Sequence, residues 1–193
     1  MRGKRGGSRK LRIIGGSWRG RNLLFAECPA IRPTPDRVRE TLFNWLQGTI
    51  RGARCLDLFA GSGALGLEAL SRGAAQVDFV EQDRSSAQSI QQHLELLQAE
   101  GGRVQRGDAL RFLGRVDLAA YDLIFLDPPF GKGVLEQVVA ELQQATLAPE
   151  LQLYIEVEKG LKTVPLPDGW EITRSGDAGQ VRYLLAENRG ELS

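Results

Sequence analysis

A run of apolar residues with an acid at its end is the feature that most constrains this chain. Residues 121–127, YDLIFLD, contain four consecutive apolar side chains between two aspartates. A strand that is apolar on both faces belongs in a parallel sheet that helices cover on both sides. Asp127, Pro128, Pro129 and Phe130 follow one another at its end. Two prolines end any strand, so this segment is either a simple terminator or a site held at a strand end.

From residue 53 onward, the chain alternates between strand and helix patterns. The predicted strands are residues 53–60, 76–83, 103–110, 121–127, 151–158, 170–177 and 180–187. The predicted helices are residues 64–73, a segment that turns Ala87, Ile90, Leu94 and Leu97 inward, and residues 134–147. The last two strands are close enough in sequence to pair antiparallel. We therefore predict an α/β fold with a doubly wound, Rossmann-like sheet whose last strand is antiparallel.

The first 50 residues have a different pattern, and we predict that they form an extension of a catalytic domain at residues 51–193. Residues 11–25 favour a hairpin, because two apolar stretches flank a centre of glycine, serine and arginine. A helix follows within residues 32–48. Thr34 is its expected cap, Pro35 its first residue, and Gly48 its end.

The net charge of +1 hides an asymmetry along the chain. Residues 1–22 carry eight basic side chains and no acid, whereas the other 171 residues carry 17 basic and 24 acidic ones. A basic segment on an acidic body favours a polyanionic partner. The candidate phosphate contacts are Arg2, Lys4, Arg5, Arg9, Lys10, Arg12, Arg19 and Arg21. Trp18 either anchors the hairpin or stacks on RNA.

The rare residues exclude several classes of protein. His93 is the only histidine, and Cys28 and Cys55 are the only cysteines, which argues against a zinc cluster or a disulfide framework. No apolar run approaches the roughly 18–20 residues of a membrane span. We therefore predict a cytoplasmic protein with no metal and no membrane attachment.

Polar or glycine residues follow three of the predicted strands. Gly61 and Gly63 come after the first strand, Glu81 ends the second, and Asp108 follows the third. Each has an ordinary alternative, either a tight turn or a solvated acid. The carboxyl ends of parallel strands meet at one edge, so together these residues favour an adenosine-type cofactor. Phe59 and Ala109 adjoin them and complete the predicted set.

Asp57 favours S-adenosylmethionine over a nicotinamide dinucleotide. It stands four residues before Gly61, where dinucleotide folds usually keep an apolar side chain. A carboxylate there can bind the positively charged amino-acid portion of a sulfonium cofactor.

The segment from Asp127 to Phe130 suits the alkylation of an exocyclic amino group. Such a nitrogen is a poor nucleophile, because its lone pair is delocalised into the base. The Asp127 carboxylate and the Pro128 carbonyl can accept its N–H groups, and the prolines hold these acceptors rigidly. Phe130 can stack on the extruded base. In the alternative, the prolines only end the strand and Phe130 belongs to the core.

Four segments resemble the RsmD family of bacterial methyltransferases, which modify guanine N2 in 16S ribosomal RNA. They are RIIGGSWRGRNL, RPTPDRVRETLFNWL, LDLFAGSGALGLEALSRGA and LIFLDPPF. The resemblance implies a class I methyltransferase fold, S-adenosylmethionine as donor, and guanine 966 of the assembling small ribosomal subunit as target. It also implies that Thr34 and Arg37 border the cofactor and the RNA. We expect a monomer.

Two other hypotheses remain open from the sequence. The segment at residues 127–130 is also compatible with a DNA adenine or cytosine amino methyltransferase, although the chain has no room for a large target-recognition region. Alternatively, the basic segment serves a non-catalytic RNA-binding assembly factor.

Overall fold

The computed structural model describes residues 8–26 and 34–189. Its centre is a seven-stranded sheet in the order β5-β4-β3-β6-β7-β9-β8. The strands are β3 (Arg54–Asp57), β4 (Gln76–Glu81), β5 (Gly102–Arg106), β6 (Leu123–Leu126), β7 (Gln152–Glu158), β8 (Trp170–Ala178) and β9 (Val181–Asn188). Neighbours from β5 to β7 are parallel, and β9 is antiparallel to both β7 and β8. The predicted sheet with its antiparallel last strand is therefore confirmed.

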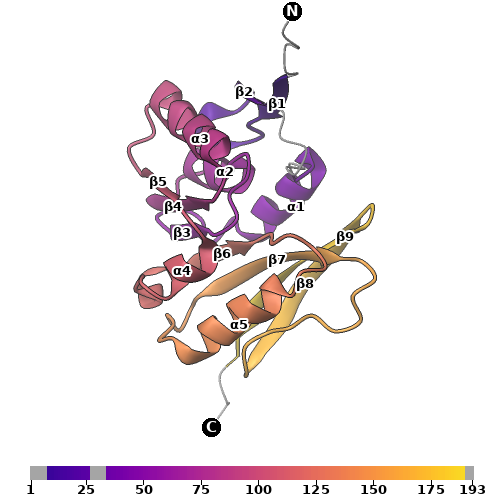
Figure 1. Ribbon diagram of the computed structural model, residues 1–193. Helices are drawn as coiled ribbons and strands as arrows, with labels where there is room; N and C mark the ends of the chain where they lie inside the picture. The colour runs from indigo at the N-terminus through magenta and orange to yellow at the C-terminus, as the bar shows by residue number, and fades with distance from the viewer. Residues whose placement is uncertain (1–7, 27–33, 190–193) are drawn as a thin grey trace, which may run out of the picture.

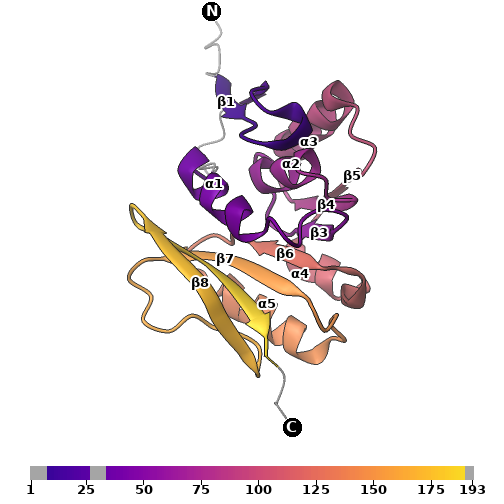
Figure 2. The ribbon, with the colours of Figure 1, turned by 180° about the vertical axis from the view of Figure 1, so that it is seen from behind.

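Helices cover both faces of this sheet (Figures 1 and 2). One face carries α1 (Asp36–Trp45), α2 (Ala64–Ser71) and α3 (Arg84–Leu97), and the other carries α4 (Ala109–Leu113) and α5 (Val134–Gln144). The side chains of β6 alternate between the two layers. Leu123 and Phe125 pack under α1 to α3, whereas Ile124 and Leu126 pack against α4 and α5. All four are at most 2% exposed, which explains why this strand is apolar on both faces.

The N-terminal hairpin packs onto α2 and α3 (Figure 1). It consists of β1 (Ser8–Arg12) and β2 (Asn22–Ala26), joined through a 3₁₀ turn at Gly16–Trp18. The predicted hairpin is confirmed, although its strands extend beyond residues 11–25 at both ends. Its apolar side chains enter the same core as the sheet: Leu11, Ile13, Leu23 and Phe25. Trp18 is half-buried against this core, and its backbone N–H donates to Ser71 Oγ at 3.0 Å. Gly16 has φ 74° and lies so close to the end of α2 that a Cβ would fall 1.8 Å from the Ser71 carbonyl oxygen.

The start of α1 differs from the prediction. Pro35 is the N-cap residue, and no side chain of the described residues caps the helix. The hydroxyl of Thr34 instead donates to Glu156 Oε1 at 2.8 Å, because that carboxylate is buried and needs donors. The helix ends at Trp45, before Gly48. Thr34 therefore belongs to the interior of the molecule and not to the helix cap.

A buried carboxylate joins the hairpin to α1 and α2. Glu68 is fully buried, and its two oxygens accept the N–H groups of Gly15 at 2.8 Å and Ile14 at 2.9 Å. They also pair with Arg72 at 2.7 Å and Arg39 at 3.4 Å. The N-terminal elements are thus held to the sheet by a shared core and by this polar network. The division of the chain near residue 50 stays a prediction.

Within residues 8–26 and 34–189, no helix is long and apolar enough to cross a membrane.

Candidate active site

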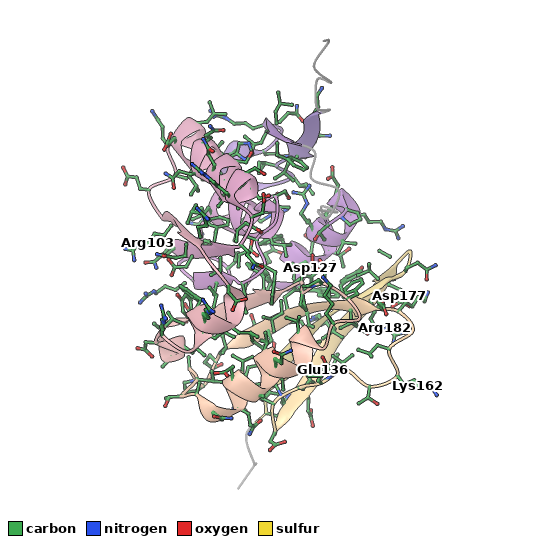
Figure 3. All side chains as sticks on the ribbon, in the orientation of Figure 1. Arg103, Asp127, Glu136, Lys162, Asp177 and Arg182 are labelled. Atoms are coloured by element: carbon green, nitrogen blue, oxygen red, sulfur yellow. The ribbon has the colours of Figure 1, made fainter. Side chains whose placement is uncertain are left out.

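A cavity of about 960 Å³ opens at the carboxyl ends of the parallel strands. Acidic residues from or just after five strands line it: Asp57, Glu81, Asp108, Asp127 and Glu156. Asp127 lies near the centre of the molecule, between the two helix layers (Figure 3). The lining also includes Phe59, Gly61, Ala109 and the residues from Pro128 to Phe130. The structure therefore brings together most of the residues that the sequence singles out for cofactor and base.

The turn between β3 and α2 depends on its glycines. Gly61 and Gly63 have φ 54° and 78°, a conformation that other residues rarely adopt. Gly63 is the N-cap residue of α2 and lies behind the cavity lining. Gly66 has a packing role instead, because a Cβ there would lie 2.2 Å from Phe79 on the sheet. The turn thus combines a close backbone approach to the cavity with close packing of helix on sheet.

Glu81 connects two loops at the rim of the cavity. Its Oε2 accepts the N–H of Gly61 at 2.7 Å, and its Oε1 accepts the N–H of Asp83 at 2.7 Å. Burial raises the pKa of Glu81, although these hydrogen bonds oppose the effect. Each oxygen retains acceptor capacity, as a ribose diol requires. Asp108 is exposed and accepts the N–H of Arg111 at 3.0 Å at the start of α4.

Asp57 is a buried acid on the α2 side of the sheet. It is 2% exposed, and its Oδ2 accepts the N–H of Gly66 at 3.0 Å. Burial raises its pKa to about 7, because the charged form is poorly solvated there. The hydrogen bond from Gly66 opposes this rise in pKa, and the nearby carboxylates of Glu81 and Glu156 contribute to it. A cationic ligand in the cavity would relieve this repulsion.

Asp127 follows β6, where Pro128 and Pro129 end the strand. Its carboxylate accepts no hydrogen bond from the described residues. Burial raises its pKa well above the ordinary value, and Glu156 and Asp57 add to the shift. Phe130 is 36% exposed at the rim and is therefore not a core residue. A half-buried acid that accepts no hydrogen bond from the described residues, beside an exposed aromatic ring, is arranged to receive a ligand.

Comparison with known proteins gives the family. A family model described as Conserved hypothetical protein 95 matches residues 11–187. Ribosomal RNA small subunit methyltransferase D of Escherichia coli strain K12 is 47% identical over 188 residues, which cover 96% of this chain and 93% of that protein. The chain belongs to the RsmD family. The protein of the same name from Haemophilus influenzae is 41% identical and covers 93% of this chain and 94% of its own length.

Solved structures agree with this assignment to the RsmD family. The structure of the Escherichia coli protein yhhF has a TM-score of 0.82 and is 44% identical, covering 95% of this chain and all of the other. The predicted class I methyltransferase fold is therefore confirmed, and the resemblance that the four motifs carry is confirmed with it.

Glu156 lines the cavity but is not among the site residues predicted from the sequence. It lies on β7 and is 4% exposed, and its Oε1 accepts hydrogen bonds from two hydroxyl groups. These come from Thr34 at 2.8 Å and Tyr154 at 2.9 Å. A detectable signal was present, because Glu156 interrupts an otherwise apolar stretch at residues 153–157. An acid in a strand that is buried on both faces needs a reason.

The residues predicted to contact RNA are placed unevenly. Arg2, Lys4 and Arg5 lie outside the described residues, and only the backbone of Arg9 is described. The exposed side chains are Lys10, Arg12, Arg19 and Arg21 on the hairpin and Arg37 on α1. Thr34 is buried and lines the cavity. Among the described residues, no group of three or more histidine, cysteine, aspartate or glutamate side chains could hold a metal ion.

Proposed function

We propose that this protein transfers a methyl group from S-adenosylmethionine to the exocyclic N2 of a guanine in 16S ribosomal RNA. The observation that carries this proposal is the Asp127–Phe130 segment at the mouth of the strand-end cavity of a methyltransferase fold. The relatives named small subunit methyltransferase D support the RNA substrate. Guanine 966 in the assembling subunit is the finer form of this proposal.

The residues of the cavity suit S-adenosylmethionine. The cofactor supplies an electrophilic methyl group on a positively charged sulfur. Asp57 would face its charged amino-acid end, Glu81 its ribose, and Phe59, Asp108 and Ala109 its adenine side. A cationic ligand fits a cavity whose acids raise one another's pKa values, because it lowers the cost of ionising them.

Asp127 has two tasks in this proposal. Its carboxylate accepts an N–H of the guanine amino group, which frees the nitrogen lone pair, and it then takes the proton that this nitrogen loses. The raised pKa of Asp127 suits a proton acceptor that works near neutral pH. The Pro128 carbonyl provides a second acceptor, and Phe130 stacks on the base, a contact worth about 1–3 kcal/mol.

One assay tests the proposed function. Purified protein and a labelled methyl donor are incubated with naked 16S RNA, with small subunits that lack the modification, and with DNA, and the labelled nucleoside is then identified. We expect N2-methylguanosine from the small subunit. Labelled adenine or cytosine in DNA would instead support the DNA methyltransferase, and no label in any nucleic acid would refute the proposal.

Cofactor affinity should depend on pH through Asp57. The pKa of Asp57 is about 3.8 in the unfolded chain and about 7 in the folded protein without ligand. The protonated folded form is therefore favoured at low pH, and this contribution to stability is lost as pH rises through about 7. A cationic ligand such as S-adenosylmethionine binds more tightly when Asp57 is ionised. The dissociation constant of S-adenosylmethionine should therefore fall several-fold between pH 6 and pH 8, with proton release. Calorimetry in buffers of different ionisation enthalpy measures both quantities.

Asp57→Asn provides the control for that titration. It should weaken binding and reduce the number of protons released by up to one. Equal affinity at pH 6 and pH 8, without proton release, would show that Asp57 is already ionised in the free protein.

The basic face of the hairpin should bind phosphates. Lys10, Arg12 and Arg21 are exposed and form no ion pair with the described residues. Their joint replacement by glutamine should lower the slope of log affinity against log salt by about 2, because each phosphate contact contributes about 0.7–0.9. Affinity for small-subunit RNA at 0.15 M salt should then fall by roughly tens of fold. Fluorescence anisotropy across a salt series measures both effects.

A matched triple variant controls for net charge. Arg103, Arg111 and Arg115 are exposed on β5, on α4 and just after it, away from the hairpin. Their replacement by glutamine should leave the salt slope near that of the wild type. Substitution is a better test than deletion of residues 1–10, because β1 begins at Ser8 and a deletion would remove part of the strand. If both triple variants changed the slope equally, the hairpin would not be the specific contact.

A further inference from the structure

Glu156 and Asp127 form a pair of carboxylates on adjacent strands. Leu126 pairs with Ile155 in the parallel register of β6 and β7, so the next residue on each strand lies side by side. Because side chains alternate along a strand, both acids lie on the face that buries Phe125. Both also line the cavity. The two acids therefore face the same part of the cavity, and the charge of Glu156 helps to raise the pKa of Asp127.

The two oxygens of Glu156 have different roles. Both of its hydrogen bonds within the described residues, from Thr34 and Tyr154, fall on Oε1. Oε2 accepts no hydrogen bond from the described residues. Thr34 is itself held in place, because Arg39 Nε donates to its carbonyl oxygen at 3.2 Å. The N-terminal segment thus fixes Oε1 and leaves Oε2 available to a ligand in the cavity.

Guanine differs from the other amino bases in the group beside its amino nitrogen. Adenine and cytosine each place an unprotonated ring nitrogen, which is an acceptor, next to the amino group. Guanine places a donor there, because N1 carries a hydrogen beside the N2 amino group. Two neighbouring carboxylates match two neighbouring donors, whereas a carboxylate that faces a ring lone pair is repelled and leaves a buried polar group unsatisfied.

We propose that Glu156 determines the choice of base: its Oε2 accepts the N1–H of guanine while Asp127 accepts an N–H of the N2 amino group. This proposal rests on the proposed function and adds a specificity-determining residue to it. The proton that leaves during the reaction comes from N2 and goes to Asp127, while the N1 proton stays on the base. Thr34 and Tyr154 are positioning residues, since their hydroxyl groups hold Glu156 and favour its ionised form.

Base analogues test this selection in the intact protein. Small subunits are reconstituted with ligated 16S RNA that carries either guanine or 2,6-diaminopurine at the target position. The analogue keeps the 2-amino group but has an unprotonated N1. We expect wild-type kcat/KM to be at least about 100-fold higher for guanine, because a site built to accept a hydrogen bond strongly rejects an analogue that lacks the donor. Equal rates for the two bases would overturn the proposal without any variant.

Glu156→Gln should change the preference and not only the rate. Its amide oxygen can still accept from Thr34 and Tyr154, while its amide N–H groups can donate to the unprotonated N1 of 2,6-diaminopurine. The preference for guanine should fall to within about 10-fold. Equilibrium binding of the two RNAs, measured without the methyl donor, should shift in the same direction. A folded E156Q protein that kept the wild-type preference would overturn the proposal.

Glu158→Gln is the matched control. Glu158 lies two residues further along β7, is exposed, and also borders the cavity, so the same chemical change is made nearby. E158Q should keep the wild-type preference for guanine. If the wild type failed to methylate guanine-containing subunits at all, the proposed function would fail. Methylation of guanine with no discrimination against the analogue would remove only the role of Glu156.

Discussion

Asp127→Ala should lower the rate of methyl transfer by at least about 100-fold, because it removes both the acceptor for the amino group and the proton acceptor. The fold should survive. Asp127 accepts no hydrogen bond from the described residues, and its neighbours Glu156 and Asp57 repel it. We therefore expect the free variant to be at least as stable as the wild type. Single-turnover kinetics, with unfolding monitored in parallel, measures both effects.

Two further variants define what Asp127 contributes. Asp127→Asn keeps an acceptor oxygen but cannot take the proton, so its rate should lie between those of the wild type and Asp127→Ala. Asp122 is the matched control, because it directly precedes β6 at the amino ends of the parallel strands, away from the cavity. There it accepts the N–H of Arg54 at 2.8 Å. Asp122→Asn should keep full activity.

The same variants separate catalysis from the alternative assembly role. If Asp127→Ala retained wild-type methylation within a few-fold, residues 127–130 would be a strand terminator and nothing more. If it lost methylation yet supported ribosome assembly as well as the wild type does, the protein would also have a binding role. The two properties can thus be measured independently in one variant.

The parts of the site that the sequence predicts are those that follow from topology alone. Asp57 and Glu81 end parallel strands and Asp127 directly follows one, and the carboxyl ends of such strands share one edge of the sheet. That these three acids line one cavity can therefore be predicted without knowing how the side chains pack. The glycine turn follows for the same reason, since a strand that enters a helix at a ligand site needs a close backbone approach.

The parts that the sequence does not predict depend on contacts between distant segments. Thr34 looks like a helix cap, because capping is a local rule, but its partner Glu156 is 122 residues away. His93 lies on the amphipathic helix α3, yet it is only 5% exposed because β2 covers that part of the helix. Its Nε2 bonds to the Leu24 carbonyl oxygen at 2.9 Å. A helical pattern shows an amphipathic face, but it does not show which other segment covers the polar face.

Glu68 is the clearest example of this limit. In the stretch ALGLEALS it reads as an ordinary helix residue, yet α2 is buried along its entire length. Its partners include the N–H groups of Ile14 and Gly15, more than 50 residues earlier in the chain. Arg39, which is 1% exposed, bonds both to Glu68 and to the carbonyl oxygen of Thr34. A single buried acid therefore links the hairpin to the residue that positions Glu156.

Glu68→Ala should consequently lower the free energy of unfolding by about 3–5 kcal/mol, the usual cost of removing one partner from a buried ion pair. The guanidinium of Arg39 would remain buried without its carboxylate partner on α2, and the two hairpin N–H groups would lose their acceptor. Glu68→Gln keeps an acceptor of the same shape and should cost less. Urea denaturation of both variants measures these differences.

Glu95→Ala provides the surface comparison, because Glu95 is exposed on α3 and, among the described residues, its side chain accepts a hydrogen bond only from Gln91 Nε2, at 3.1 Å. Its effect should stay within about 0.5 kcal/mol. A Glu68→Ala effect as small as that would mean that apolar packing alone holds the hairpin. The larger loss of unfolding free energy in Glu68→Ala would have a second consequence, in the cavity that holds Glu156. Because Arg39 holds Thr34 and Thr34 holds Glu156, weakening this network should reduce the discrimination between guanine and 2,6-diaminopurine before the protein unfolds.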